Sequence, residues 1–158
     1  MAFLSIRSTI MCKNVTADKE GTHIHSLLAD PLYANSNPGF VTACLAVQVE
    51  CDGQPTKGRI ELRAEGFAHS HQFEAQRGER LAAGAIMIFI PVLREGDLEI
   101  AIVDAARPEH RLTTRWGLAF EEDAQVLGES AADTILAAAK KHADQTSERI
   151  RATYRRAA

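Results

Sequence analysis

The fold is decided by the stretch that begins Ile86-Met87-Ile88-Phe89-Ile90-Pro91-Val92-Leu93 and ends at Phe120. The turn residues Arg94-Glu95-Gly96-Asp97 end its first apolar run, and two further runs follow over residues 98–103 and 112–120. Short β-branched and aromatic runs that are broken by Gly, Pro and Asp are typical of consecutive antiparallel strands. This stretch therefore predicts three successive strands at the centre of the core.

Two residues of this stretch indicate how its strands are oriented. Trp116 shares the apolar side of the third run with Leu118 and Phe120, so we expect the only tryptophan to point inward. Pro91 has no N–H with which to donate a ladder hydrogen bond, so it predicts an edge position or a bulge for the first run.

Period-two alternation extends toward the N-terminus and predicts further strands. The apolar side of the first strand is expected to hold Leu4, Ile6, Ile10 and Cys12. The turn Asp18-Lys19-Glu20-Gly21 separates it from a second strand over residues 22–28. The polar stretch 30–39, which contains Pro and Gly, predicts a long loop between two sheets. More strands are predicted over residues 41–51, 59–64 and 67–73.

Seven or eight strands at spacings of about ten residues, without intervening helices, are typical of an antiparallel sandwich. We therefore predict a mainly β fold, in which residues 1–122 form an antiparallel immunoglobulin-like β-sandwich. Residues 123–158 are predicted as a C-terminal helical extension. Its helix should begin at Ser130-Ala131-Ala132-Asp133, which has the spacing of a capping box. The helix should be long, because neither Gly nor Pro follows through to Ala158.

The predicted helix carries a narrow apolar stripe, whose residues recur at three- and four-residue steps. An Ala-rich stripe buries little area, and such a helix is marginal alone, so it should dock on the sandwich, pair with a second copy or bind a partner. Its length favours an association surface. The residues of this stripe are Ile135, Leu136, Ala139, Ala143, Ile150 and Tyr154.

The charge and the cysteine content of the chain limit which cellular compartment and which kinds of partner are expected. The net charge is -3, but residues 140–158 hold six Lys and Arg against two Asp and Glu, so the tail is basic and the body acidic. The acidic body would repel a phosphate backbone, so nucleic acid is not an expected partner. Three cysteines without CxxC spacing fit a reducing cytoplasm. No apolar run suits a signal peptide or a membrane span.

The N-terminal part of the chain carries a loose motif, Met11-Cys12-Lys13-Asn14-Val15, followed by Gly21, Leu27-Leu28, Phe40 and an alternating strand up to Gly53. Over about the first 65 residues the chain resembles a family of small, uncharacterised bacterial proteins with an immunoglobulin-like sandwich. It departs from that family at Lys13-Asn14, where the family tends to show an acidic residue. The resemblance implies a bacterial cytoplasmic β-sandwich and brings no functional residues.

Histidine pairs are the candidates for metal binding. His23 and His25 lie two apart on one predicted strand, as do His69 and His71 on another, so each pair projects to one face. The four imidazoles would converge only if the two strands were neighbours. Because no Cys or carboxylate at ligand spacing completes either pair, we expect solvated strand faces, with neither a metal nor another cofactor.

Enzymatic chemistry has weaker support in the sequence. Cys12, Cys44 and Cys51 are better explained as buried thiols than as nucleophiles, and no phosphate-binding glycine motif is present. The sequence therefore favours a non-enzymatic cytoplasmic module that self-associates or binds a protein partner through its C-terminal helix. The first alternative is a ligand- or metal-binding sandwich that uses the histidine pairs, and the second is a Cys/His hydrolase.

Overall fold

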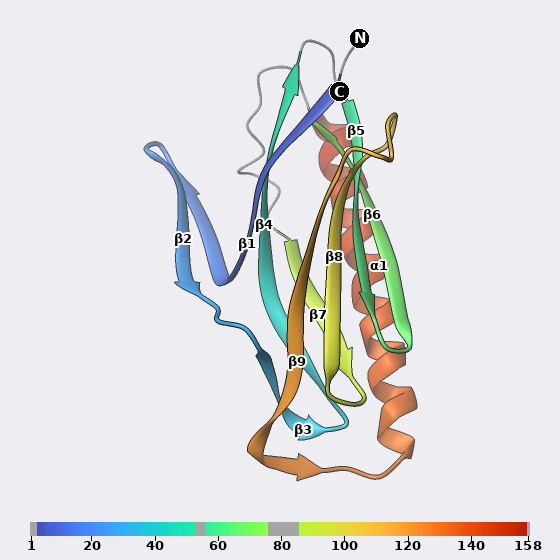
Figure 1. Cartoon of the computed structure of the whole chain (residues 1–158). Helices are drawn as coiled ribbons and strands as arrows, with labels where there is room; N and C mark the ends of the chain where they lie inside the picture. The colour runs from blue at the N-terminus through green and yellow to red at the C-terminus, as the bar shows by residue number, and fades with distance from the viewer. Residues whose placement is uncertain (1–2, 53–55, 76–85, 158) are drawn as a thin grey trace.

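The computed structural model describes residues 3–52, 56–75 and 86–157, and this part of the chain is mainly β with one C-terminal helix (Figure 1). That coarse prediction is confirmed. In chain order the elements are β1 (Phe3–Asp18), β2 (Gly21–Leu27), β3 (Leu32–Asn37), β4 (Gly39–Asp52), β5 (Thr56–Ala64), β6 (Phe67–Ala75), β7 (Ile86–Val92), β8 (Gly96–Asp104), β9 (Arg111–Val126) and α1 (Ser130–Ala157).

The strands form two sheets around one core. Sheet A has the strand order β2-β1-β4-β7, and sheet B has the order β3-β9-β8-β5-β6. Both sheets contribute to one cluster of buried aliphatic side chains, which includes Leu45 and Val47 of β4 and Ile60, Ile100 and Ile102 of sheet B. Each such side chain contributes about 1.5–3 kcal/mol when it is fully buried, so this cluster is the main force that holds the two sheets together.

The central stretch forms β7, β8 and β9, as the sequence predicts. β8 lies inside sheet B and pairs antiparallel with β9, where Leu98 is opposite Trp116. Leu98 is fully buried, and the half-buried Trp116 packs against the core, so the inward orientation of the tryptophan is confirmed. Pro91 lies in β7, an edge strand of sheet A, which also agrees with the prediction.

The predicted loop over residues 30–39 is wrong, because it contains β3. The buried Leu32 and Ala34 alternate with the exposed Tyr33, and the strand pairs with β9. A proline on each side of this six-residue strand gives the segment the composition of a loop and hides its alternation. β3 runs parallel to β9, so sheet B is mixed and the antiparallel-only prediction is wrong. The described residues hold nine strands, more than predicted.

The first strand contains a β-bulge. Its pairing with β4 shifts register between Ile6 and Ser8, and beyond the shift Ile10 and Cys12 pair with Ala46 and Cys44. An inserted residue locally disrupts the alternation of a strand. The side chains of Leu4 and Ile6 lie outside the described residues, so one common face from Leu4 to Cys12 stays a prediction.

The helix packs against the edge strands of both sheets. It begins at Ser130, as predicted, has Asp133 in its first turn and runs for 28 residues. It lies along β6 of sheet B and β7 of sheet A, and its buried Ala139 and Ala143 belong to the same core cluster as the strands (Figure 1). Within the part of the chain that the structure describes, no helix is long and apolar enough to cross a membrane.

Candidate functional site

The apolar stripe of the helix faces the chain's own sheets. Ala139 and Ala143 are buried, and Ile150 packs against the core. Ile135 and Leu136 are half-buried, and the side chain of Tyr154 lies outside the described residues. The exposed positions of the helix are mostly polar or charged, including Lys140, Lys141, Asp144, Gln145 and Glu148. That the helix binds another chain stays a prediction.

The two histidine pairs do not converge. His23 and His25 lie on β2, at one end of sheet A, whereas His69 and His71 lie on β6, at one end of sheet B (Figure 1). Nε2 of His23 is 2.9 Å from Oδ2 of Asp18, and Nε2 of His25 is 2.8 Å from Oγ1 of Thr16. Among the described residues, no group of three or more His, Cys, Asp or Glu side chains is arranged to hold a metal ion.

The second histidine pair belongs to a polar cluster beneath the helix. The hydroxyl of Ser147 is 3.0 Å from Nε2 of His69 and 2.8 Å from Nδ1 of His71, and the two imidazole centroids are 4.5 Å apart. A serine hydroxyl can donate its proton to one imidazole and accept an N–H from the other. This cluster therefore ties α1 to β6 by two hydrogen bonds.

Burial keeps the imidazoles of this cluster neutral. Burial, followed by the charges of His69 and His142, lowers the pKa of His71 to about 4. Burial also lowers the pKa of His69, against the opposing effect of Asp144, and burial lowers the pKa of His142. At neutral pH these imidazoles are therefore uncharged, and they can be buried between helix and sheet without the cost of burying a charge.

A serine beside a histidine also suggests acyl transfer, but the position of Ser147 argues against that chemistry. Ser147 lies in the middle of α1, where the backbone N–H groups donate to carbonyls one turn earlier. Those groups cannot also form an oxyanion hole, which usually supplies the largest stabilisation in acyl transfer. Neither Ser147 nor His142 was predicted from the sequence. Both lie three or four residues after a buried alanine of the helix, His142 after Ala139 and Ser147 after Ala143, and this helical spacing could have indicated that they face the sheets.

Two cysteines lie side by side in the interior of sheet A. Cys12 and Cys44 are register partners on β1 and β4, and both are buried free thiols. Burial, followed by the neighbouring Cys12, raises the pKa of Cys44 to about 11. The thiolate is the reactive form, so Cys44 is unreactive at neutral pH and gives the Cys/His hydrolase alternative no support. The side chain of Cys51 lies outside the described residues.

A β-hairpin extends from sheet A, and one of its strand edges has no partner strand in the part of the chain that the structure describes. β1 pairs with β4 only as far as Cys12, and from Cys12 to Asp18 it pairs with β2. Residues 13–27, which we call the arm, therefore form a two-stranded ribbon (Figure 1). The arm exposes two large apolar side chains, Ile24 at 39% and Leu27 at 72%. Among the described residues β2 pairs with β1 alone.

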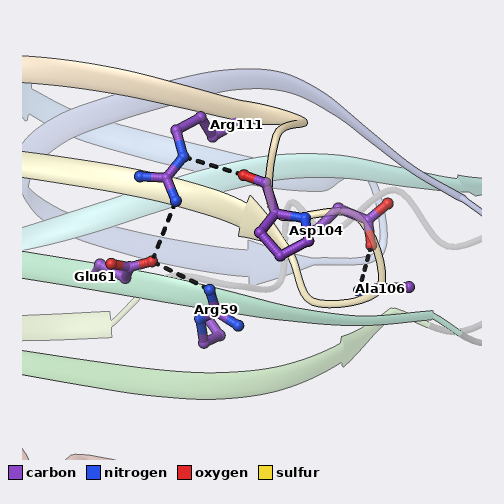
Figure 2. A network of polar contacts seen from close by, with 6 residues as sticks. Arg59, Glu61, Asp104, Ala106 and Arg111 are labelled. Atoms are coloured by element: carbon purple, nitrogen blue, oxygen red, sulfur yellow. Dashed lines mark hydrogen bonds and ion pairs between the residues drawn. The ribbon is translucent and has the colours of Figure 1, made fainter.

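The outer face of sheet B carries a charged network. Nη2 of Arg59 is 3.4 Å from Oε1 of Glu61, and a guanidinium nitrogen of Arg111 is 3.9 Å from the same oxygen (Figure 2). Nε of Arg111 donates to the carbonyl of Pro108, which fixes the guanidinium. The preceding turn is held by the buried Asp104, whose carboxylate accepts the backbone N–H of Ala106 at 3.0 Å.

A hollow of about 300 Å³ lies beside this network. Small side chains line it, namely Ala68, Ser70 and Ala101, and charged side chains surround them. The charged residues are Glu61, Arg63, Glu99 and Arg111. We call this feature the sheet B hollow. Nothing in the sequence pattern predicts it, because its residues come from four strands that only the strand order brings together.

Comparison with models of known protein families gives no match, and comparison with curated proteins gives none either. The resemblance of the N-terminal residues to a bacterial sandwich family therefore stays a prediction.

Proposed function

We propose that this chain is a protein-interaction module that self-associates, and that the arm forms the contact by pairing β2 with β2 of a second copy. The observation that carries the proposal is the edge of β2, which pairs with no further strand among the described residues, on a ribbon whose apolar side chains are exposed. An exposed strand edge presents N–H and C=O groups that pair readily with a strand of another chain.

The four sheet edges differ in their protection. Helix α1 packs on the edge strands β6 and β7, and β7 also contains Pro91. The third edge strand, β3, has only six residues and a proline on either side. β2 has seven residues, Gly21 to Leu27, and none of them is Pro, Lys, Arg, Asp or Glu. These are the residue types that natural proteins use to block edge pairing, so β2 is the edge left open to a partner strand.

The arm also needs a partner for its own stability. A two-stranded hairpin is at best marginally stable in water, and the arm beyond Cys12 has no third strand among the described residues. His23, Ile24, His25, Ser26 and Leu27 are all exposed. Pairing with a second arm would make a four-stranded ribbon and satisfy the backbone groups along the edge of β2.

A second copy suits this edge because antiparallel pairing about a two-fold axis is self-complementary. With the axis near the middle of β2, Ile24 lies opposite Ile24 of the second copy and His23 lies opposite His25. An apolar cross-strand pair contributes about 0.2–1 kcal/mol relative to alanine. Sheet A of one chain would then continue into sheet A of the other.

This proposal keeps the predicted class of function but moves the contact from the helix to the arm. We also propose that the body of the chain is an immunoglobulin-like sandwich, which the two sheets around one core support. A bacterial cytoplasmic location is part of the proposal and is supported by the free thiols of Cys12 and Cys44. A partner that binds the helix would have to use its exposed polar face, because the apolar stripe packs on β6 and β7.

The test compares oligomeric state by light scattering in three chains. We expect the wild type to be a dimer and Ile24→Lys to be a monomer with unchanged circular dichroism, because a charge on an edge strand opposes pairing. Tyr33→Lys is the matched control, since Tyr33 is exposed on another edge strand, β3, and this variant should remain a dimer.

Two results would contradict the proposal. The first is a wild-type chain that remains a monomer in light scattering at every protein concentration tested. The second is a dimer that survives Ile24→Lys; if Lys140→Glu with Lys141→Glu then dissociates it, the contact lies on the exposed face of the helix instead.

A further inference from the structure

We propose that the sheet B hollow binds a small ligand through an oxyanion, either a carboxylate or a phosphate, and that Arg63 and Arg111 hold that group. Neither the sequence nor the proposed self-association assigns any role to this face. The shape of the hollow, its charge and the hydrogen-bonding state of its arginines support this assignment.

The shape of the hollow follows from cross-strand register. Glu61 of β5 is the partner of Ala101 on β8 and of Ser70 on β6, so two small side chains flank one long one. In the next row Arg63 is the partner of Glu99 and of Ala68. Long charged side chains therefore stand around small ones, and the half-open hollow of about 300 Å³ lies at the small end of known ligand sites.

The charge of this face favours an anion. The hollow is lined by two arginines, Arg63 and Arg111, and by two carboxylates, Glu61 and Glu99. Arg59 and Arg115 lie outside the lining and pair with those two carboxylates. Glu61 lies between Arg59 and Arg111, and Glu99 is 3.2 Å from Arg115. Both carboxylates are thus already near a guanidinium, and positive charge remains on a chain whose net charge is -3.

The guanidinium N–H groups of Arg63 are available to a ligand. Within the described ranges Arg63 makes no ion pair, although Glu99 is its register partner, and the ion pair of Glu99 is with Arg115. A guanidinium offers five N–H donors in a planar fork that matches carboxylate and phosphate oxygens. Arg111 is held in place through Nε by the carbonyl of Pro108, which leaves its other nitrogens beside the hollow. The hydroxyl of Ser70 adds a further donor.

The test titrates the full-length chain separately with inorganic phosphate and with succinate at constant ionic strength, and follows the arginine side-chain and backbone amide signals by NMR. We expect saturable shifts at the hollow in the millimolar range. Arg63→Gln should weaken binding about tenfold or more, as loss of a charge-assisted contact does. Arg94→Gln is the charge-matched control, because Arg94 pairs with Glu65 outside the hollow, and it should bind as the wild type does.

Ala101→Leu tests shape instead of charge, because a larger side chain at this position fills the hollow and should abolish binding while every arginine remains. Should that variant fail to fold, the exposed Arg63→Gln still decides the question. Saturation by phosphate alone identifies a phosphorylated ligand, by succinate alone a carboxylated one, and by both a general oxyanion site. Shifts no larger than those caused by chloride, or equal binding by Arg63→Gln and wild type, overturn the proposal.

Discussion

Acidification should loosen the contact between α1 and β6, and His71 is the group through which this effect can be measured. In the folded chain its pKa is about 4, mainly because the side chain is buried, against an ordinary value of 6.5. The titratable groups that act on it are His69 on β6 and His142 on α1, and these two are in turn influenced by Asp144 and by Arg149 of α1. The unfolded chain therefore binds a proton at a higher pH than the folded chain does.

The size and direction of the effect follow from this difference. Above pH 6.5 the full contribution to stability is present, and it is lost as the pH falls from 6.5 to about 4. A shift of this size corresponds to about 3 kcal/mol, at about 1.4 kcal/mol for each pKa unit. The pKa values of His69 and His142 are lowered as well, so these groups add to the loss in the same direction.

The assay is urea unfolding at fixed protein concentration, at several pH values between 7.5 and 4, in wild type and His71→Gln. Glutamine stays neutral throughout, so the variant should lose about 3 kcal/mol less free energy of unfolding across this range. His110→Gln is the control, because His110 is exposed and should keep the wild-type slope. Equal pH slopes for wild type and His71→Gln would refute the reasoning, whatever the stability of either at neutral pH.

Two further predictions concern the core. Ala139→Asp places a charge in the buried contact between helix and sheets and should lower the free energy of unfolding by about 3 kcal/mol or more. Ala138→Asp, at an exposed position of the same helix, should change it little. Equal effects of the two variants in chemical denaturation would contradict the docking of α1. In a Cys51→Ser background, the thiols of Cys12 and Cys44 should resist Ellman's reagent at pH 8 until the chain is unfolded, and rapid reaction of the native chain would contradict their burial and the raised pKa of Cys44.

The alternation of apolar and polar residues predicted the strands in which one face is buried along the whole length. β4 was predicted from its alternation, and Val41, Ala43, Leu45, Val47 and Val49 are all buried. The Asp18–Gly21 turn was predicted as well, because the turn residues are contiguous in sequence. β3 was missed because a six-residue strand between two prolines has too few alternating positions to outweigh its loop composition.

The candidate sites depend on which strands are neighbours, and local pattern does not contain that information. The two histidine pairs look equivalent in the sequence, yet β2 lies at one end of sheet A and β6 lies beneath the helix at one end of sheet B. Three residues of the helix stripe, Ala139, Ala143 and Ile150, pack on the core of their own chain, which the sequence pattern alone did not decide. The sheet B hollow needs the register of β5 with both β6 and β8, which is fixed only when the strands pair.

The arm and the sheet B hollow belong to different sheets, and this separation links the two proposals. β2 is an end strand of sheet A, whereas the hollow lies on β5, β6, β8 and β9 of sheet B. Pairing through β2 would therefore leave both hollows of a dimer open. Contributions of sites that are distant and share no partners add independently, so Ile24→Lys should not change oxyanion affinity and Arg63→Gln should not change the dimer. Coupling between them would mean that the second copy reaches sheet B, and the contact would then have to be larger than a pair of strands.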